Sequence, residues 1–184
     1  VCRTAYQSPQ RVSPELFYVL QKSLKISELS EGTFDVTIGP VVRLWREARR
    51  NHRLPDAERL SEARLAVGFQ NVVLDSETHT VFLKRDDMKL DLGAIAKGYA
   101  ADQGLAVLWK YGIHRALVDA GGDLALGDPP PGSGGWDIRV HEWDKESKSE
   151  RLWLRLHNVG IATSGDTFQF LEKRGEHFSH IINP

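Results

Sequence analysis

The stretch Lys89–Gln103, KLDLGAIAKGYAADQ, changes character along its length. It begins with alternating polar and apolar residues, as a strand does, and from Ala94 onward its apolar residues recur at helical spacing. The helical pattern continues to Gly112, a residue type that commonly ends helices. An extended segment leading into a long helix is therefore predicted. Asp91 in the first half and Lys97 among small residues in the second have two explanations, packing or a ligand site.

Three helices are predicted before this stretch and mainly strands after it. The first helix spans residues 13–27 with Ser13 as N-cap, the second runs from Gly39-Pro40 to about Arg50, and the third enters at Pro55-Asp56. Residues 71–75 and 80–84 form a hairpin candidate around the polar tip SETH. Further strands are expected within residues 115–121, 136–143, 151–157 and 177–183, with a loop over 127–135 and a helix over 167–173.

This order of elements predicts the α+β class, with a mixed, largely antiparallel sheet and flanking helices. A chain of 184 residues is long enough for one domain with a sizeable core, so a single domain over residues 1–184 is expected.

Composition excludes several classes of function. The formal net charge is -1 and basic residues alternate with acidic ones, which argues against nucleic-acid binding. One cysteine, Cys2, allows no internal disulfide. No apolar stretch is long enough to span a bilayer, and the first residues lack a signal-peptide pattern. Because the chain begins without methionine, a removed leader and an excised piece both stay open.

Four short segments combine glycine with a carboxylate or hydroxyl: GTFDVT, DLGAIAKG, DAGGDLALG and ATSGD. Glycine lets the backbone approach a ligand, and carboxylates beside a phosphate cradle suggest a shared divalent cation. Each segment also has a structural explanation. GTFDVT is consistent with a turn and a strand, DAGGDLALG with a tight hairpin, and ATSGD with a helix N-cap at Ser164 or Asp166. Lys97 alone is consistent with a solvated side chain.

The histidines near the end, His177 and His180, are spaced unlike zinc ligands, so a single histidine acting as general base is the better interpretation. ATSGD has alanine where a serine-hydrolase elbow needs its first glycine, which disfavours that chemistry.

Five segments taken in order resemble the ApbE family of FAD:protein FMN transferases: GTFDVTIGP, LDLGAIAKGYAAD, DAGGDLALG, GIATSGD and HIINP. The resemblance covers residues 32–184. It implies an ApbE-like fold and the Mg²⁺-assisted transfer of FMN from FAD to a threonine of an acceptor flavoprotein, with release of AMP. It also implies an acceptor protein as partner and a location in the periplasm or cell envelope, with membrane attachment only through a lipid anchor outside this chain.

The resemblance also assigns residues to roles. His180 becomes the base that activates the incoming threonine, and the backbone carbonyl of Ala94 becomes a Mg²⁺ ligand, with the remaining ligands expected beyond Pro184. The implied FAD-binding residues are Phe34, Asp35, Val36, Thr37, Asp91, Lys97, Gly121, Gly122, Asp123, Thr163, Ser164 and Gly165, and Asp166 is expected beside them.

Departures from the family pattern leave alternatives open. Relative to the family, the chain is expected to lack an N-terminal segment and the C-terminal segment that completes the metal site, and Asn183 stands where an aspartate is common. A truncated, non-catalytic flavin-binding module and an FAD pyrophosphatase that yields FMN and AMP are therefore the alternatives to a transferase.

Overall fold

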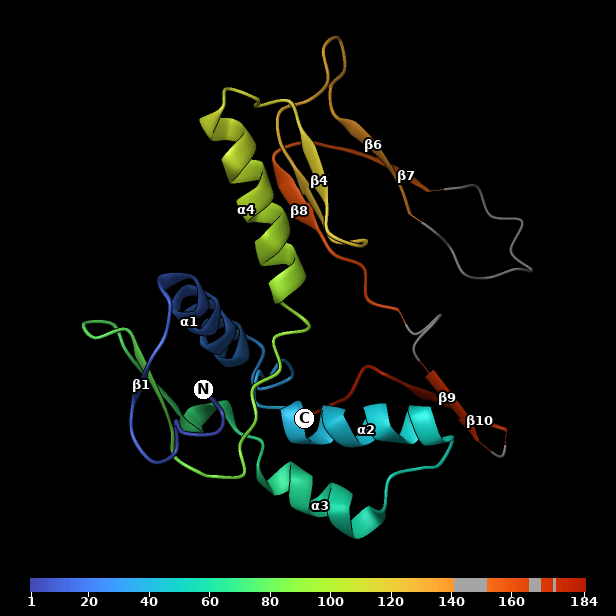
Figure 1. Ribbon diagram of the computed structural model, residues 1–184. Helices are drawn as coiled ribbons and strands as arrows, with labels where there is room; N and C mark the ends of the chain where they lie inside the picture. Colours follow the sequence, from blue (N-terminus) through green and yellow to red (C-terminus); the bar gives the residue numbers. More distant parts are fainter. Residues whose placement is uncertain (141–151, 166–169, 174) are drawn as a thin grey trace. The chain divides into compact units, whose positions relative to one another are not determined.

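A computed structural model describes residues 1–140, 152–165, 170–173 and 175–184 (Figure 1). The chain divides into two compact units, each with its own secondary structure. The first unit comprises Val1–Ala94 and Phe168–Pro184, and the second comprises Ile95–Thr167. The expectation of one domain therefore stays a prediction, and each unit is described by itself.

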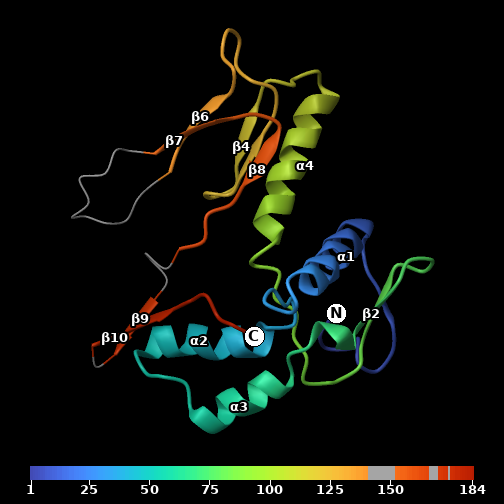
Figure 2. The same cartoon turned by 180° about the vertical axis from the view of Figure 1, so that it is seen from behind.

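The first unit contains helices α1, α2 and α3 and two small antiparallel sheets (Figures 1 and 2). The helices are α1 (Pro14–Leu29), α2 (Gly39–Asn51) and α3 (Ala57–Leu65), followed by the short 3-10 helix η1 (Phe69–Asn71). One sheet has the order β1-β3-β2, from β1 (Gln10–Arg11), β2 (Val72–Asp75) and β3 (Thr80–Leu83), and the other pairs β9 (Phe170–Lys173) with β10 (Glu176–Ser179).

The core of the first unit lies between α1 and the sheet β1-β3-β2. Leu20 of α1, Val81 and Leu83 of β3, Val36 and Met88 are all fully buried in one cluster. Phe34 packs against the same cluster from its edge. Since Val36 and Phe34 belong to the segment GTFDVT, this segment is anchored directly in the core.

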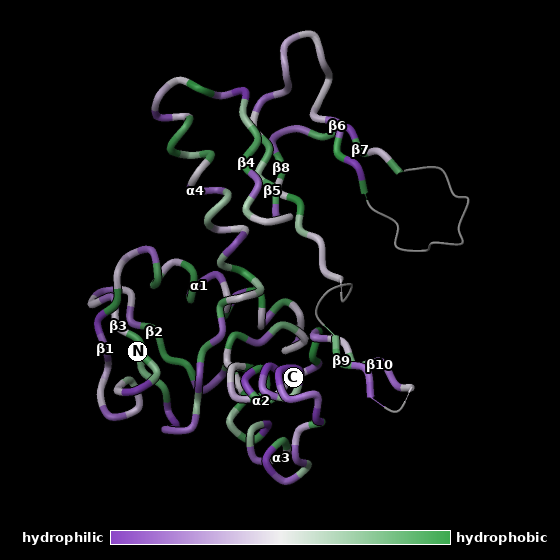
Figure 3. The backbone as a smooth tube through the Cα atoms, turned by 45° about the vertical axis from the view of Figure 1, so that its right-hand side comes forward, coloured by the Kyte–Doolittle hydropathy of each residue, from purple (hydrophilic) through white to green (hydrophobic). Residues whose placement is uncertain are grey.

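The second unit packs one helix against a three-stranded sheet. Helix α4 (Ala96–Lys110) contacts β4 (Leu117–Asp119), β5 (Leu124–Leu126) and β8 (Val159–Ile161), which form an antiparallel sheet in the order β4-β5-β8. Ala101 and Leu105 of α4 meet Ala125 of β5 in a small core. Figure 3 shows apolar stretches in these strands.

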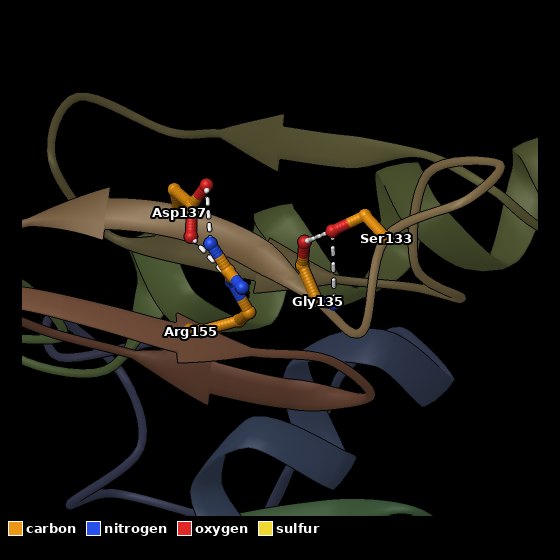
Figure 4. A network of polar contacts seen from close by, with 4 residues as sticks. All are labelled: Ser133, Gly135, Asp137 and Arg155. Carbon is orange, nitrogen blue, oxygen red and sulfur yellow. Dashed lines mark hydrogen bonds and ion pairs between the residues drawn. The ribbon is translucent and has the colours of Figure 1, made fainter.

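The hairpin of β6 (Trp136–Arg139) and β7 (Trp153–Leu156) carries exposed polar contacts (Figure 4). Asp137 faces Arg155 across the strands, with Oδ1 2.7 Å from Nε. This hydrogen bond and the charge of Arg155 lower the pKa of Asp137. Before the hairpin, the Ser133 hydroxyl donates to the carbonyl of Gly135 and closes the end of the loop.

The α+β class and the antiparallel pairing are confirmed, and in the described residues the strands form four small sheets. The helix that begins at Pro14 has its N-cap at Ser13, whose Oγ accepts from Leu16 N–H at 3.2 Å. The hairpin over β2 and β3 is also confirmed.

The predicted helix over residues 167–173 is wrong where the structure describes it, because Phe170–Lys173 is strand β9. Leu171 is buried, and β9 pairs along its whole length with β10, so the strand partner outweighs the helix propensity of Leu, Glu and Lys. Asp166 and the ends of the strands predicted over 136–143 and 151–157 lie outside the described residues.

Candidate functional site

The first group of predicted site residues is Phe34, Asp35, Val36 and Thr37, and its polar side chains are already bonded within the chain. Asp35 Oδ1 accepts from the Thr37 N–H at 2.7 Å and from its hydroxyl at 2.6 Å. Asp35 Oδ2 accepts from Phe69 N–H at 3.0 Å, and the Thr37 hydroxyl accepts from Gly68 N–H at 2.7 Å. Both side chains are buried, so they tie this segment to the loop before η1.

The same segment positions Asp91. The Asp91 N–H donates to the carbonyl of Val36 at 2.8 Å, which fixes the backbone at the start of the stretch Lys89–Gln103. The Asp91 carboxylate is mostly buried, with 16% of the side chain exposed. Its Oδ1 accepts from Gly93 N–H at 2.8 Å, and its Oδ2 lies 2.9 Å from Nη2 of Arg46. Asp91 is thus held from three sides before any ligand binds.

The turn that follows Asp91 exposes Ala94, the predicted metal-binding carbonyl. Among the described residues no donor bonds to that carbonyl, so its lone pairs are available. A single carbonyl is not a magnesium site, however, because Mg²⁺ takes six oxygen ligands in near-octahedral geometry. The described residues contain no group of three or more His, Cys, Asp or Glu side chains that could hold a metal, so they do not by themselves fit Mg²⁺.

His180 follows β10 in the first unit and is partly buried. Its Nδ1 is buried and has no hydrogen-bond partner in the part of the chain that the structure describes. No described contact therefore fixes which ring nitrogen carries the proton, and no carboxylate of the described residues bonds to Nδ1 as one does in a triad histidine.

In the second unit, Lys97 and Asp123 form an ion pair. Lys97 Nζ lies 3.2 Å from Asp123 Oδ1, and the exposed fractions of the side chains are 50% and 13%. Lys97 lies in the first turn of α4, whose N-cap Ile95 makes no side-chain capping bond and whose first turn has no acidic residue. The amino end of α4 therefore has uncapped N–H groups beside a lysine, a combination that attracts anions.

The glycines of DAGGDLALG form the turn between β4 and β5, as the hairpin explanation predicts. Gly121 and Gly122 have φ of 73° and 95°, a region that favours glycine, and both are exposed. Asp119 Oδ1 accepts from Gly122 N–H at 2.7 Å and stabilises the turn. The turn therefore offers a backbone surface with open space around it, and Asp123 joins it to α4.

Thr163, Ser164 and Gly165 continue the chain beyond β8 and are exposed. Ile161, the last residue of β8, pairs with Leu124, the first residue of β5. The residues after β8 therefore leave the sheet at the end where the glycine turn enters it. Lys97, the glycine turn and this segment gather at one end of the second unit.

The predicted residues thus fall into two groups. Phe34 to Thr37, Asp91, Ala94 and His180 belong to the first unit, and Lys97, Gly121 to Asp123 and Thr163 to Gly165 belong to the second. Sequence reasoning missed Arg46, the partner of Asp91, and Asp119, which holds the glycine turn. No local signal could have found Arg46, because its partner Asp91 lies 45 positions further along the chain.

The chain is an α+β protein in which a glycine turn and a lysine lie beside an uncapped helix start, groups of the kind that anion-binding sites use. The sequence profile of the ApbE family matches residues 1–184, and the chain belongs to that family.

The chain is similar in sequence to curated relatives and in structure to solved proteins. The chain is 34% identical over 98% of its length to an FAD:protein FMN transferase of Klebsiella pneumoniae and 28% identical, again over 98%, to one of Haemophilus influenzae. The match covers 55% and 54% of those relatives, so the chain spans about half their length. The ApbE protein of Thermotoga maritima matches with TM-score 0.84 at 28% identity, covering 100% of this chain and 60% of that one. The flavin transferase ApbE of Vibrio cholerae matches with TM-score 0.85 at 28% identity, covering 99% and 58%.

Proposed function

We propose that the chain is the flavin-handling part of an FAD:protein FMN transferase, which moves FMN from FAD to a threonine of an acceptor flavoprotein. The observation that carries this proposal is the pairing of Lys97 with Asp123 beside a glycine turn and an uncapped helix start. A pyrophosphate is the part of FAD that such a surface suits. The names of the curated relatives support flavin as the substrate.

In the proposed reaction, the threonine oxygen of the acceptor attacks the phosphorus of the FMN half. The bond from that phosphorus to the bridging pyrophosphate oxygen breaks, and AMP leaves with the bond's electron pair. The proton of the threonine hydroxyl goes to His180, the proposed base. Lys97 and the first N–H groups of α4 would hold the charge of the phosphates, and Asp91 would contact FAD from its bonded position.

The proposal includes Mg²⁺, for which the described residues supply only part of the ligand set. When bound, a divalent cation would neutralise phosphate charge, and the free carbonyl of Ala94 would supply one of its ligands. The other ligands would have to come from phosphate oxygens, water and groups outside the described residues. A location in the cell envelope is proposed from the family resemblance alone. The described residues include no helix that is both long and apolar enough to span a membrane.

The proposal is tested by mixing the full chain with FAD, Mg²⁺ and an acceptor flavoprotein fragment that carries the target threonine. A mass increase on the acceptor equal to FMN less water, together with released AMP, is the expected result. Free FMN and AMP with unlabelled acceptor would instead identify a pyrophosphatase. Bound FAD with neither product would identify a flavin-binding module.

The base is tested separately with His180→Ala. FAD affinity should stay at the wild-type value, while transfer should slow about 100-fold or more, the usual range for removing a general base. His157→Ala is the control, because His157 is exposed and is not one of the proposed site residues. Wild-type transfer by His180→Ala would remove histidine from the reaction.

A further inference from the structure

Arg46 pairs with Asp91, a largely shielded carboxylate of the candidate site. Its Nη2 lies 2.9 Å from Asp91 Oδ2, and Asp91 is largely shielded from solvent while Arg46 is 56% exposed. An arginine beside a shielded carboxylate forms a stronger, better-oriented ion pair than two exposed side chains do.

The fold sets Arg46 opposite this carboxylate. Gly39, at the start of α2, lies so close to Lys89 that an added Cβ would stand 2.5 Å from the Lys89 carbonyl oxygen, and Ile38 forms a parallel bridge with Lys89. Arg46 is seven residues further, on the same helix face and about 10.5 Å along the axis. The four residue-to-residue steps from Lys89 to Gly93 cover at most about 13 Å. Helix α2 therefore runs beside residues 89–93, and Arg46 lies near the end of this segment.

Arg46 also lies close to the turn that follows Asp91. Nη2 of Arg46 would lie 3.9 Å from a Cβ placed on Gly93, and Gly93 N–H donates to the other oxygen of Asp91. The guanidinium, the carboxylate and the Gly93 amide thus form one chain of contacts. This chain ends one residue before Ala94.

We infer that Arg46 is a positioning residue: it holds the Asp91 carboxylate and the turn to Gly93 in the geometry that receives FAD. This inference rests on the proposed function for its ligand. Arg46 also neutralises Asp91, whose charge would otherwise repel an incoming phosphate. Arg46 acts through Asp91, so replacing Arg46 should have no further effect on FAD binding once Asp91 has been replaced.

The first experiment needs no flavin. Hydrogen exchange of the Gly93 amide is measured in the full wild-type chain, in Arg46→Ala and in Arg50→Ala. Arg50 is the matched control because it is an exposed arginine on the same helix, with no partner found in the described residues. Exchange about three- to tenfold faster in Arg46→Ala alone is expected. Equal exchange in both variants would overturn the inference.

The second experiment titrates FAD and combines the changes. Arg46→Ala should weaken FAD binding about three- to tenfold, Arg46→Lys should recover part of the loss, and Arg50→Ala should bind as the wild type does. In an Asp91→Ala background, Arg46→Ala should cause no further loss. An equal loss in both backgrounds would mean that Arg46 acts independently of Asp91 and would overturn the inference. Absence of FAD binding by the wild type would instead contradict the proposed function, and the exchange experiment would still decide the role of Arg46.

Discussion

Two segments that look alike in the sequence differ sharply in the structure. GTFDVT and DAGGD each combine glycine with aspartate. In the first, Asp35 and Thr37 are buried and bonded to each other and to the loop before η1. In the second, Gly121 and Gly122 are exposed at positive φ, and Asp123 pairs with a half-exposed lysine.

This difference separates two ways of building a site. The polar side chains of the first segment bond within the fold, and its backbone holds Asp91 through the bond from Asp91 N–H to the Val36 carbonyl. The second segment exposes the backbone of its two glycines to solvent, while its Asp123 is shielded beside Lys97. Substitutions in the first segment should therefore act mainly on stability, and substitutions in the second mainly on binding.

The largest effect is expected from Asp35→Ala. The change leaves two backbone N–H groups and the Thr37 hydroxyl without their buried acceptor, so the free energy of unfolding should fall by about 3 kcal/mol. Urea denaturation measures the loss. Asp35→Asn keeps one carbonyl acceptor and should lose less. A loss of FAD affinity at unchanged stability would show instead that Asp35 binds the ligand directly.

A pair of glycine substitutions extends the comparison to the packing of each unit. Gly39→Ala would put a Cβ 2.5 Å from the Lys89 carbonyl oxygen, and the required backbone shift should cost about 2 kcal/mol. Gly98→Ala, within α4, meets no atom within 4 Å and should stabilise the chain by up to about 1 kcal/mol through helix propensity. Thermal unfolding of the two variants checks the opposite signs, and two equal shifts would contradict the close approach at Gly39.

Sequence patterns predicted most of the local elements but not the contacts between distant segments. Ser13-Pro14, Asp56 and Gly112 mark helix ends by chemistry that acts over a few residues, and each is found where expected. Strand β9 was missed because its partner β10 decides its structure. The bonds from Asp35 to Phe69 and from Arg46 to Asp91 join residues 34 and 45 positions apart, and no local pattern encodes such contacts.

The next effect concerns binding more than stability. Lys97→Ala removes a half-exposed partner of Asp123, so the free energy of unfolding should change by less than about 0.5 kcal/mol. The FAD affinity should fall about tenfold. Fluorescence titration with FAD and urea denaturation measure the two quantities on the same samples. Lys110→Ala, at the other end of α4, is the control. A stability loss as large as that of Asp35→Ala would abolish the distinction between the two segments.

The smallest effect contrasts buried Asp35 with exposed Asp137, which shares a bidentate pair with Arg155 across β6 and β7. The hydrogen bond and charge of Arg155 lower the pKa of Asp137 from its ordinary 3.8. A carboxylate whose pKa is lower in the folded chain adds stability above the ordinary pKa and loses it as the pH falls towards the folded pKa. Between pH 7 and pH 3 the unfolding midpoint of Asp137→Asn should therefore fall slightly less than that of the wild type.

Salt separates the exposed pair from the buried one. Because Asp137 and Arg155 are both exposed, 0.5 M salt should remove most of this difference, whereas salt should leave the loss of stability in Asp35→Ala unchanged. A salt-resistant difference at Asp137 would mean that this pair is shielded as Asp35 is.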